Sequence, residues 1–348
     1  MIFEIGERKI GDGEKVFIVA ELSSNHNNDF DIAVKTIEAV AECGADAVKL
    51  QTYTPDCMTI NCDNDYFRIN NGTIWDGKTL YGLYEEAHMP WEWQPELKEI
   101  AEDLGLIFFS SAFDKTSVDF LEKMDVPAYK VASFEITDLP LIEYIASKKK
   151  PIILSTGIAS LCDIEEAVNV CREVGNQELA LLKCTSSYPS LPEEMNLAAI
   201  NTLKNTFKTV VGFSDHSTGI NMTIASIALG ANIIEKHVTL DKKLGGTDSF
   251  FSVEPEIFKK LVKSVRDVEK SLGVSEVIVS DKMKQNSMFG RSIFVVKDIK
   301  RGDMFSKENI KIIRPGNGLK PKYIKNIIGM VANKDIKQGT PLNWNMVG

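Results

Sequence analysis

The chain has 348 residues, of which 44% are apolar and 26% charged, and its net charge is −9 at pH 7. This is the composition of an ordinary globular protein, and the length suits a barrel of about 250 residues with a small appendix. The sequence has no apolar run near the roughly 20 residues of a membrane helix and no signal-peptide pattern, so we expect a cytoplasmic protein without membrane association.

Apolar strand-like runs alternate with amphipathic helical stretches through most of the chain. The predicted strands are Val16–Glu21, Ala47–Gln51, Leu106–Ser111, Ala128–Ala132, Pro151–Ser155, Leu179–Thr185, Thr209–Ser214 and Ile233–His237. The predicted helices include Asp29–Cys43, Gln94–Leu104, Thr116–Lys123, Leu139–Ser147, Leu161–Val174, Thr218–Leu229 and Pro255–Leu272. Such alternation predicts an α/β fold with a parallel sheet, and eight units favour a closed (β/α)8 TIM barrel over an open sheet.

The segment from Thr52 to Trp93 is longer than an ordinary connection between a strand and a helix. It follows a predicted strand, at the end of the barrel where active-site lids are found. Both a lid and a purely structural insertion remain open for this segment.

The pattern changes after Gly273, where a polar linker precedes short strands punctuated by glycine and proline. We therefore predict a catalytic domain at 1–273, a linker at 274–289 and a small turn-rich domain at 290–348. From Asn286 onward there are 12 Lys and Arg against 4 Asp and Glu, a charge of +8, which leaves −17 for the rest. Opposite charges favour docking of the small domain on the barrel, in cis or across a dimer, over binding of nucleic acid.

Two of the four histidines, His216 and His237, stand 21 positions apart at equivalent points of consecutive strand–helix repeats. If the strands that they end are parallel neighbours, both imidazoles emerge at the same end of the sheet. With Asp215 and Glu235 beside them, they predict a divalent-metal site. A single histidine is more often a packing or surface residue, and the repeated context is what favours ligation here.

Reactive groups in barrel enzymes come from the carboxyl ends of the strands. Here those ends carry lysines, carboxylates and hydroxyls: Glu21, Lys49, Gln51, Ser111, Lys130, Ser133, Glu135, Ser155, Ser186, Tyr188, Ser214 and Glu235. Lysines and hydroxyls beside a glycine turn predict a phosphate cradle, and a metal next to it suggests a phosphorylated substrate that meets a polarised carbonyl. Strand alternation leaves the direction of Lys49 and Lys130 open, and a Schiff-base lysine of a metal-free aldolase is an alternative.

These segments match a known family: Ala20–His26, Val48–Gln51, Tyr129–Ser133, Leu154–Gly157, Ser214–His216 and Glu235–Thr239. The chain resembles the sialic acid synthase family over nearly its whole length. Arg291–Gly348 resembles the antifreeze-like (SAF) domain of that family, notably at Arg314–Gly318. The resemblance implies condensation of phosphoenolpyruvate with an acetamido-sugar aldehyde and release of phosphate by C–O cleavage.

The resemblance also implies roles for individual residues. His216 and His237 would hold a divalent cation, manganese, magnesium or cobalt. The implied contacts to phosphoenolpyruvate are Lys49, Lys130, Ser133, Ser155, Ser186 and Ser214, with Ser111 a weaker match. Glu21, Glu135 and Glu235 would orient substrate or move protons, and with Lys49 and Lys130 they form the expected catalytic set. Gln51, Tyr188 and Asp248 are further expected substrate contacts, and Arg314 is implied to reach the sugar of a partner subunit in a domain-swapped homodimer.

Within the family, some segments resemble the branch that uses a diacetamido 6-deoxy sugar: Asp63–Ile69, Trp75–Tyr81, Tyr84–Trp93, Ala132–Thr137 and Asp248–Pro255. We therefore expect 2,4-diacetamido-2,4,6-trideoxy-altrose as the sugar, with Phe134 against its 6-methyl group. Synthases of N-acetylneuraminate and legionaminate, which usually have glycine at Phe134 and asparagine at Ser186, are the nearest alternative. A binding protein without enzymatic activity is another, because the tail resembles ice-binding proteins.

Overall fold

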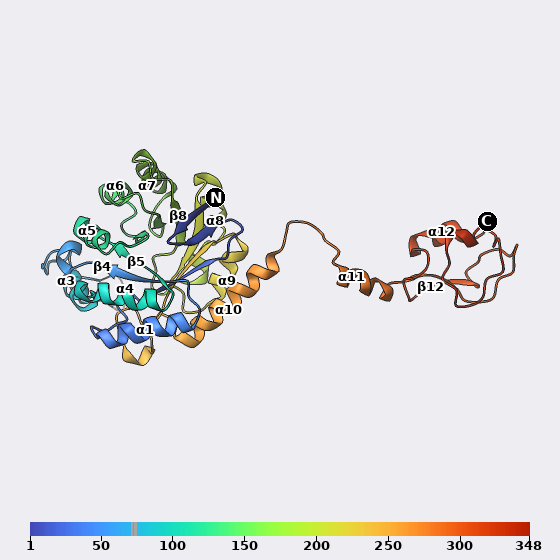
Figure 1. Ribbon diagram of the computed structural model, residues 1–348, viewed down its shortest axis with the longest axis horizontal. Helices are drawn as coiled ribbons and strands as arrows, with labels where there is room; N and C mark the ends of the chain where they lie inside the picture. The colour runs from blue at the N-terminus through green and yellow to red at the C-terminus, as the bar shows by residue number, and fades with distance from the viewer. Residues whose placement is uncertain (71, 73–74) are drawn as a thin grey trace. The chain divides into compact units, whose positions relative to one another are not determined.

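A computed structural model of the chain describes residues 1–70, 72 and 75–348. The chain forms two compact units, Met1–Gly273 and Val274–Gly348. The first unit is the part drawn from blue to light orange in Figure 1, with strands at its centre and helices around them.

The core of the first unit is built from continuous apolar runs that form strands. They are β3 (Phe17–Glu21), β4 (Ala47–Thr52), β5 (Ile107–Ala112), β6 (Tyr129–Val131), β7 (Ile152–Ser155), β8 (Leu179–Cys184), β9 (Val210–Asp215) and β10 (Ile233–His237). These eight strands of the described chain close into a barrel in the order β10-β3-β4-β5-β6-β7-β8-β9, and every pairing is parallel. The predicted barrel is confirmed, and each predicted strand shifts by no more than a residue or so at its ends.

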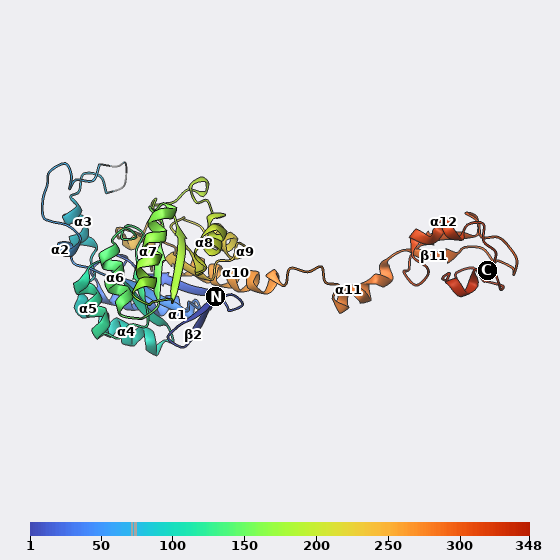
Figure 2. The same ribbon diagram turned by 90° about the horizontal axis from the view of Figure 1, so that it is seen from above.

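Helices surround the barrel, as the two views in Figures 1 and 2 show. They are α1 (Phe30–Glu42), α4 (Gln94–Asp103), α5 (Lys115–Lys123), α6 (Leu139–Ser147), α7 (Leu161–Glu173), α8 (Ala199–Phe207), α9 (Asn221–Ala228) and α10 (Pro255–Leu272). Local sequence sets several helix starts, since the side chains of Asp114, Asp138 and Ser160 accept backbone N–H bonds at the first turns of α5, α6 and α7. Within the described residues, we find no helix that combines the length and the apolar character needed to cross a bilayer.

An N-terminal hairpin, β1 (Ile2–Ile5) and β2 (Arg8–Gly11), packs against the first residues of the barrel strands. Ile5 and Ile10 are fully buried in one apolar cluster with Phe17 and Phe109 of the barrel interior. The sequence patterns above did not predict this hairpin. It fills the amino end of the barrel with apolar side chains, so the polar groups of the interior lie toward the carboxyl end.

The long insertion contains the short helices α2 (Pro55–Met58), α3 (Leu80–Ala87) and η1 (Trp91–Trp93). The indole of Trp75 contacts the rings of Tyr188 and Phe250, with centroid distances of 6.3 and 6.4 Å. Because Tyr188 follows β8 and Phe250 follows β10, the insertion lies against the loops at the carboxyl end of the barrel. This is the position in which a lid was expected.

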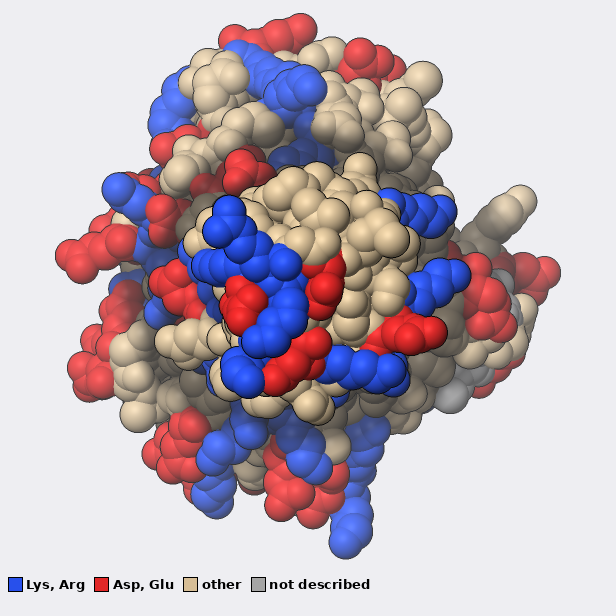
Figure 3. All heavy atoms as spheres, turned by 90° about the vertical axis from the view of Figure 1, so that its right-hand side faces the viewer, with Lys and Arg blue, Asp and Glu red and all other residues tan. Residues whose placement is uncertain are grey.

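The second unit has a small core of its own around Ile293, Val295, Phe305 and Leu342. Its elements are α11 (Asp281–Asn286), η4 (Ser287–Phe289), β11 (Ser292–Val295), β12 (Ile310–Ile313), η5 (Pro321–Tyr323), α12 (Ile324–Ile327) and η6 (Trp344–Met346). The stretch that we expected to be a linker therefore holds a short helix. The face of this unit in the foreground of Figure 3 shows Lys and Arg mixed with Asp and Glu beside an uncharged area.

The hairpin yields a test of what closes the barrel. Ile5→Ala should lower the free energy of unfolding of the first unit by about 3 kcal/mol, because it leaves a cavity at a fully buried site. The matched control is Ile2→Ala on the same strand, where the side chain is 54% exposed and the loss should stay below about 0.5 kcal/mol. Urea unfolding of both variants measures the difference, and equal losses would contradict the packing role of the hairpin.

Candidate active site

A lysine held between two carboxylates lies inside the barrel near the carboxyl ends of its strands. Lys49 Nζ is 2.5 Å from Glu21 Oε2 and 3.8 Å from Glu235 Oε2, and all three side chains are at most 5% exposed. The residues come from the adjacent strands β3, β4 and β10, so their side chains meet on the inner face. Ser111 and Ser214 complete the group, because Lys49 donates to Ser111 Oγ at 3.1 Å and Ser214 donates to Glu235 Oε1 at 3.0 Å.

The buried charges shift one another's protonation. Burial raises the pKa of Glu21 to about 7, although Lys49 opposes the shift. Burial also acts against the charged form of Glu235, but Lys49 and Lys130 outweigh it, and the pKa of Glu235 is lowered. Burial alone would lower the pKa of Lys49, but the two carboxylates raise it. Lys49 and Glu235 therefore stay charged near neutral pH, whereas Glu21 can exchange a proton there.

The second predicted lysine, Lys130 of β6, is also inside the barrel and 1% exposed. Its ammonium donates to the Val131 carbonyl oxygen at 2.7 Å. Burial lowers its pKa, in spite of the attraction of Glu235. An ammonium with one neutral partner is poorly compensated in a dry interior, and an anion placed beside it would restore the balance.

Hydroxyls from neighbouring loops converge beside a glycine turn after β7. Ser133 Oγ and Ser186 Oγ are 2.7 Å apart. A Cβ at Gly157 would lie 2.0 Å from Ser186 Oγ and 3.0 Å from Ser133 Cβ, so this position admits only glycine without displacing its neighbours. The predicted cradle of hydroxyls with a glycine turn is thus present as a close arrangement.

Several buried polar atoms in this region have no hydrogen-bond partner among the residues that the structure describes. Among them are Ser155 Oγ, Glu135 Oε2 and His237 Nδ1. Leaving such a group unpaired costs about 1–3 kcal/mol, so unpaired groups that gather in one region mark a place where a ligand would supply the missing partners. Burial raises the pKa of Glu135 to about 7, against the attraction of Lys130.

The two predicted metal ligands lie side by side at the ends of β9 and β10. The ring centroids of His216 and His237 are 5.2 Å apart. His216 Nδ1 is 3.0 Å from the Thr185 carbonyl oxygen, so it carries the proton and leaves Nε2 with a free electron pair. Burial holds the pKa of His237 well below its usual value, so this imidazole is neutral. Burial acts against the charged form of His216, but Cys184 and the Thr185 carbonyl oxygen outweigh it and raise the pKa of this imidazole. A cation at the pair would take the place of that proton, and two ring nitrogens, one of them buried without a partner, are donors that suit a first-row divalent cation.

His216 and His237 would supply two donors to a metal ion. In the described parts of the chain, no cluster of three or more His, Cys, Asp or Glu side chains is arranged to hold one. Tyr188 and Phe251 pack on the imidazoles, with ring centroids 4.5 Å from His216 and 4.8 Å from His237, respectively. Sequence reasoning missed Phe251, although it falls in a segment that was singled out for another reason.

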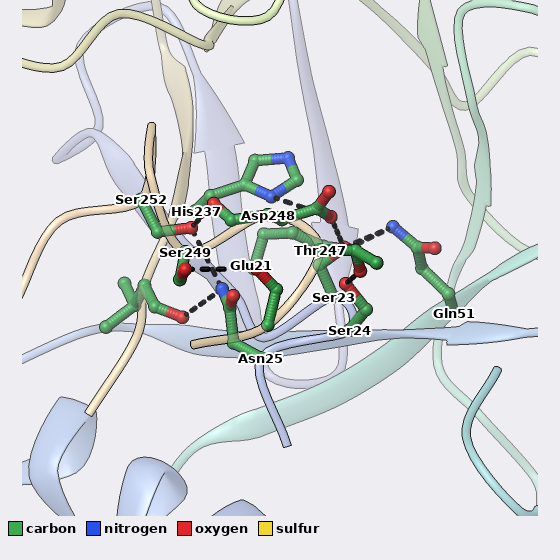
Figure 4. A network of polar contacts seen from close by, with 12 residues as sticks. Glu21, Ser23, Ser24, Asn25, Gln51, His237, Thr247, Asp248, Ser249 and Ser252 are labelled. Carbon is green, nitrogen blue, oxygen red and sulfur yellow. Dashed lines mark hydrogen bonds and ion pairs between the residues drawn. The ribbon is translucent and has the colours of Figure 1, made fainter. Parts of the chain in front are cut away.

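Figure 4 shows a polar network that joins the loop after β3 to the loop after β10. Gln51 Nε2 donates to Glu21 Oε1 at 2.9 Å and to Ser23 Oγ at 3.0 Å, and Ser23 donates in turn to Asp248. Asp248 Oδ2 is 3.9 Å from His237 Nδ1, and burial raises the pKa of this carboxyl. The network brings the predicted Gln51 and Asp248 to the same site. Ser23 is the bridge between them, a role that the sequence did not reveal.

One sequence-based expectation is wrong, and two of the predicted site residues have exposed side chains. Asp215 does not lie beside the histidines, because its neighbour in the chain, His216, occupies the inner face and alternation turns Asp215 outward to Lys236 and Thr223. Phe134 follows β6 but is 56% exposed. Arg314 belongs to the second unit, where its side chain is exposed.

Comparisons with known proteins agree with the geometry. The NeuB family model matches residues 36–277, and the SAF domain model matches residues 290–348. A pseudaminic acid synthase from Campylobacter jejuni is 46% identical over 94% of this chain and 96% of its own length. An N,N'-diacetyllegionaminic acid synthase from Legionella pneumophila is 37% identical over 98% and 97%. The crystal structure of an N-acetylneuraminic acid synthetase from Leptospira borgpetersenii is similar with a TM-score of 0.74, at 32% identity over 82% of this chain and 95% of that chain.

The buried Glu135 gives a prediction for the pH dependence of stability. Its pKa of about 7 in the folded chain lies above the ordinary 4.5, so the folded state keeps the proton between these values and loses stability as pH rises through them. Glu135→Gln removes this loss, and its advantage in free energy of unfolding should grow by about 2 kcal/mol from pH 5 to pH 8.

Urea unfolding at the two pH values measures this change. Glu96→Gln, at an exposed position of α4, is the control for the amide substitution itself. An advantage of Glu135→Gln that is the same at both pH values would show that the carboxyl is not buried in its neutral form.

Proposed function

The chain belongs to the NeuB family, and we propose that it condenses phosphoenolpyruvate with the open-chain aldehyde of 2,4-diacetamido-2,4,6-trideoxy-altrose to give pseudaminic acid and phosphate. The reaction class is that of a C–C bond-forming transferase. The choice of sugar is supported by the higher identity to the pseudaminic acid synthase than to the legionaminic acid synthase. The observation that carries the proposal is the buried cluster of Glu21, Lys49 and Glu235 beside polar atoms that lack partners.

Phosphoenolpyruvate is an anion, and the barrel offers it ammonium and hydroxyl donors. Lys130 and Lys49 supply the charge, and the hydroxyls of Ser133, Ser155 and Ser186 are placed to donate hydrogen bonds. Ser111 and Ser214 bind Lys49 and Glu235 and so hold these groups in place. Binding of an anion would give Lys130 the compensation that the Val131 carbonyl alone does not provide.

The proposed reaction forms one C–C bond, and at C2 it exchanges the C–O bond to phosphate for a C–O bond to water. C3 of phosphoenolpyruvate attacks the aldehyde carbon, water adds to the resulting cationic C2, and the adduct expels phosphate. Glu21 and Glu135, whose pKa values are both about 7, can pass the protons that the aldehyde oxygen gains and the water loses. A divalent cation, manganese, magnesium or cobalt, bound through His216 and His237 would polarise the aldehyde carbonyl.

A metal-free aldolase is the second candidate, because the lowered pKa of Lys130 is what an amine nucleophile needs. Such an enzyme would form a Schiff base with pyruvate that borohydride reduces to a stable adduct. Mass spectrometry of the chain after treatment with pyruvate and borohydride separates the two chemistries, and a labelled Lys130 would reject the condensation proposed here.

The cellular setting is also a proposal. The six cysteines are free thiols, as expected of a protein in a reducing compartment, and we assign the chain to the cytoplasm. A domain-swapped homodimer, in which Arg314 of one subunit contacts the sugar in the other, accounts for the opposite net charges of the two domains.

Phosphate release from phosphoenolpyruvate tests the substrate. It should occur with the 2,4-diacetamido-2,4,6-trideoxy-altrose aldehyde, fall at least about 10-fold with N-acetylmannosamine, stop after treatment with a chelator and return with Mn²⁺. Phe134→Gly should reduce the preference for the 6-deoxy sugar by about 5-fold, the value of one lost methyl contact. Phosphate release that prefers N-acetylmannosamine would replace the proposed sugar, and an unchanged preference in Phe134→Gly would remove Phe134 from its recognition.

Arg314 gives a test of the dimer. Arg314→Ala should raise KM for the sugar about 10-fold or more, the worth of one charged hydrogen bond, and leave KM for phosphoenolpyruvate nearly unchanged. Arg301→Ala, another exposed arginine of the same domain, is the control and should change neither constant. In a heterodimer of an Arg314→Ala chain and an inactive Lys49→Met chain, the barrel with intact Lys49 should regain its sugar affinity if each barrel receives Arg314 from the partner chain. Equal effects on both KM values would contradict this role.

A further inference from the structure

We propose that the buried ion pair between Asp215 and Lys236 positions His216 and His237 for the cation, an inference that rests on the metal role proposed above. Asp215 Oδ2 and Lys236 Nζ are 3.1 Å apart, and both side chains are fully buried. The two residues are register partners in the β9–β10 ladder. Each directly precedes one of the histidines in the chain, so the pair clamps the two strands at the point where the imidazoles leave them.

The pair and the histidines lie on opposite faces of the same two strands. Successive side chains of a strand alternate between faces, so an ion pair on the helix side directs the next side chain to the interior. Thr223 of α9 donates a hydrogen bond to Asp215, which confirms the outward direction of that carboxylate. The contact between the two imidazoles shows the inward direction of the residues that follow.

The pair also holds the residue after His216. The Ser217 backbone N–H donates to Asp215 Oδ1 at 2.8 Å, and Lys236 Nζ donates to the Ser217 carbonyl oxygen. His216 is therefore fixed from both sides, by Asp215 before it and by Ser217 after it. This grip ends the strand and explains why α9 begins at Asn221, three residues later than the apolar pattern predicted.

The energetics favour a positioning role over a purely structural one. Burying two charges costs several kcal/mol of solvation, and a well-packed apolar pair would bind the strands at least as strongly. What an apolar pair cannot do is fix the direction of the Ser217 backbone and the register of two strand ends by hydrogen bonds. Groups that orient metal ligands from behind typically change metal affinity by 10- to 100-fold when removed.

The chain offers a matched control at the opposite end of the barrel. Arg266 Nη2 is 2.7 Å from Asp46 Oδ2, and Arg266 Nη1 donates to the Val16 carbonyl oxygen just before β3. This ion pair joins α10 to the residues just before β3 and β4, at the amino end of the barrel, whereas the two histidines lie at the carboxyl ends of β9 and β10. Its loss should lower stability without any effect on the cation.

The experiment measures Mn²⁺ affinity directly, from the electron paramagnetic resonance signal of free Mn²⁺, in the full-length wild-type chain and in Lys236→Met, Asp215→Asn, Arg266→Met and His216→Ala. Lys236→Met and Asp215→Asn should raise the Kd for Mn²⁺ about 10-fold, and His216→Ala should abolish binding. Arg266→Met should lower the thermal midpoint and keep the wild-type Kd. If the single variants do not fold, the double variant Asp215→Leu with Lys236→Met, which leaves no unpaired buried charge, takes their place and should lose the same affinity.

The outcomes separate the two levels of the argument. Pair variants that fold and bind Mn²⁺ as tightly as the wild type, while His216→Ala does not bind, would overturn the positioning role alone. If His216→Ala binds Mn²⁺ as tightly as the wild type, the metal role and the positioning role are both overturned. If Arg266→Met weakens Mn²⁺ binding as much as Lys236→Met does, the effect reflects general stability, and the inference is also overturned.

Discussion

The contact between Lys49 and the two carboxylates of Glu21 and Glu235 governs the chemistry of the barrel interior. Because this ammonium is stabilised by two acids, it stays protonated and cannot act as a nucleophile. Glu235 is held in its charged form by the same contact, whereas Glu21 bears the cost of burial and titrates near 7. Lys130 has no acid at hydrogen-bonding distance in the described chain, so its positive charge is available to an anion. The two glutamates, Glu21 and Glu235, therefore differ in protonation, and so do the two lysines, although the residue types are the same.

Strand alternation lets the same short motif serve two purposes. In β10, Glu235 and His237 point into the barrel, and Lys236 between them points to the helices. The inner residues line the site proposed for the substrate, while the outer one joins β9 through Asp215. The two ends of the barrel interior also differ. The hairpin fills the amino end with apolar side chains such as Ile5, so the polar groups lie at the carboxyl end. The site is therefore bounded by apolar packing below and by ion-paired strand ends at its side.

The barrel, its strands and the residues at the strand ends could be predicted from the sequence, because parallel strands covered by helices read as continuous apolar runs with polar ends. The facing direction of those residues could not, because a shift of one residue in the strand end exchanges the two faces. For this reason the sequence does not decide which face Lys49 and Lys130 occupy, and it predicts the wrong face for Asp215. The bridge from Gln51 through Ser23 to Asp248 joins residues about 225 positions apart and leaves no local pattern. The hairpin at residues 2–11 was missed because two strands of four residues are too short for periodicity to show.

A pair of imidazoles is a small donor set, and that has consequences for how a cation would act here. Structural metal sites are usually closed by four protein ligands, whereas catalytic ones keep positions for water or substrate. His216 and His237 leave most positions open, and the rings of Tyr188 and Phe251 limit the solvent that reaches them. The aldehyde oxygen of the sugar would therefore occupy one of the open positions and strengthen binding of the cation. By linkage, the cation would then strengthen sugar binding by the same factor, so the direction of the two histidines would affect both affinities together.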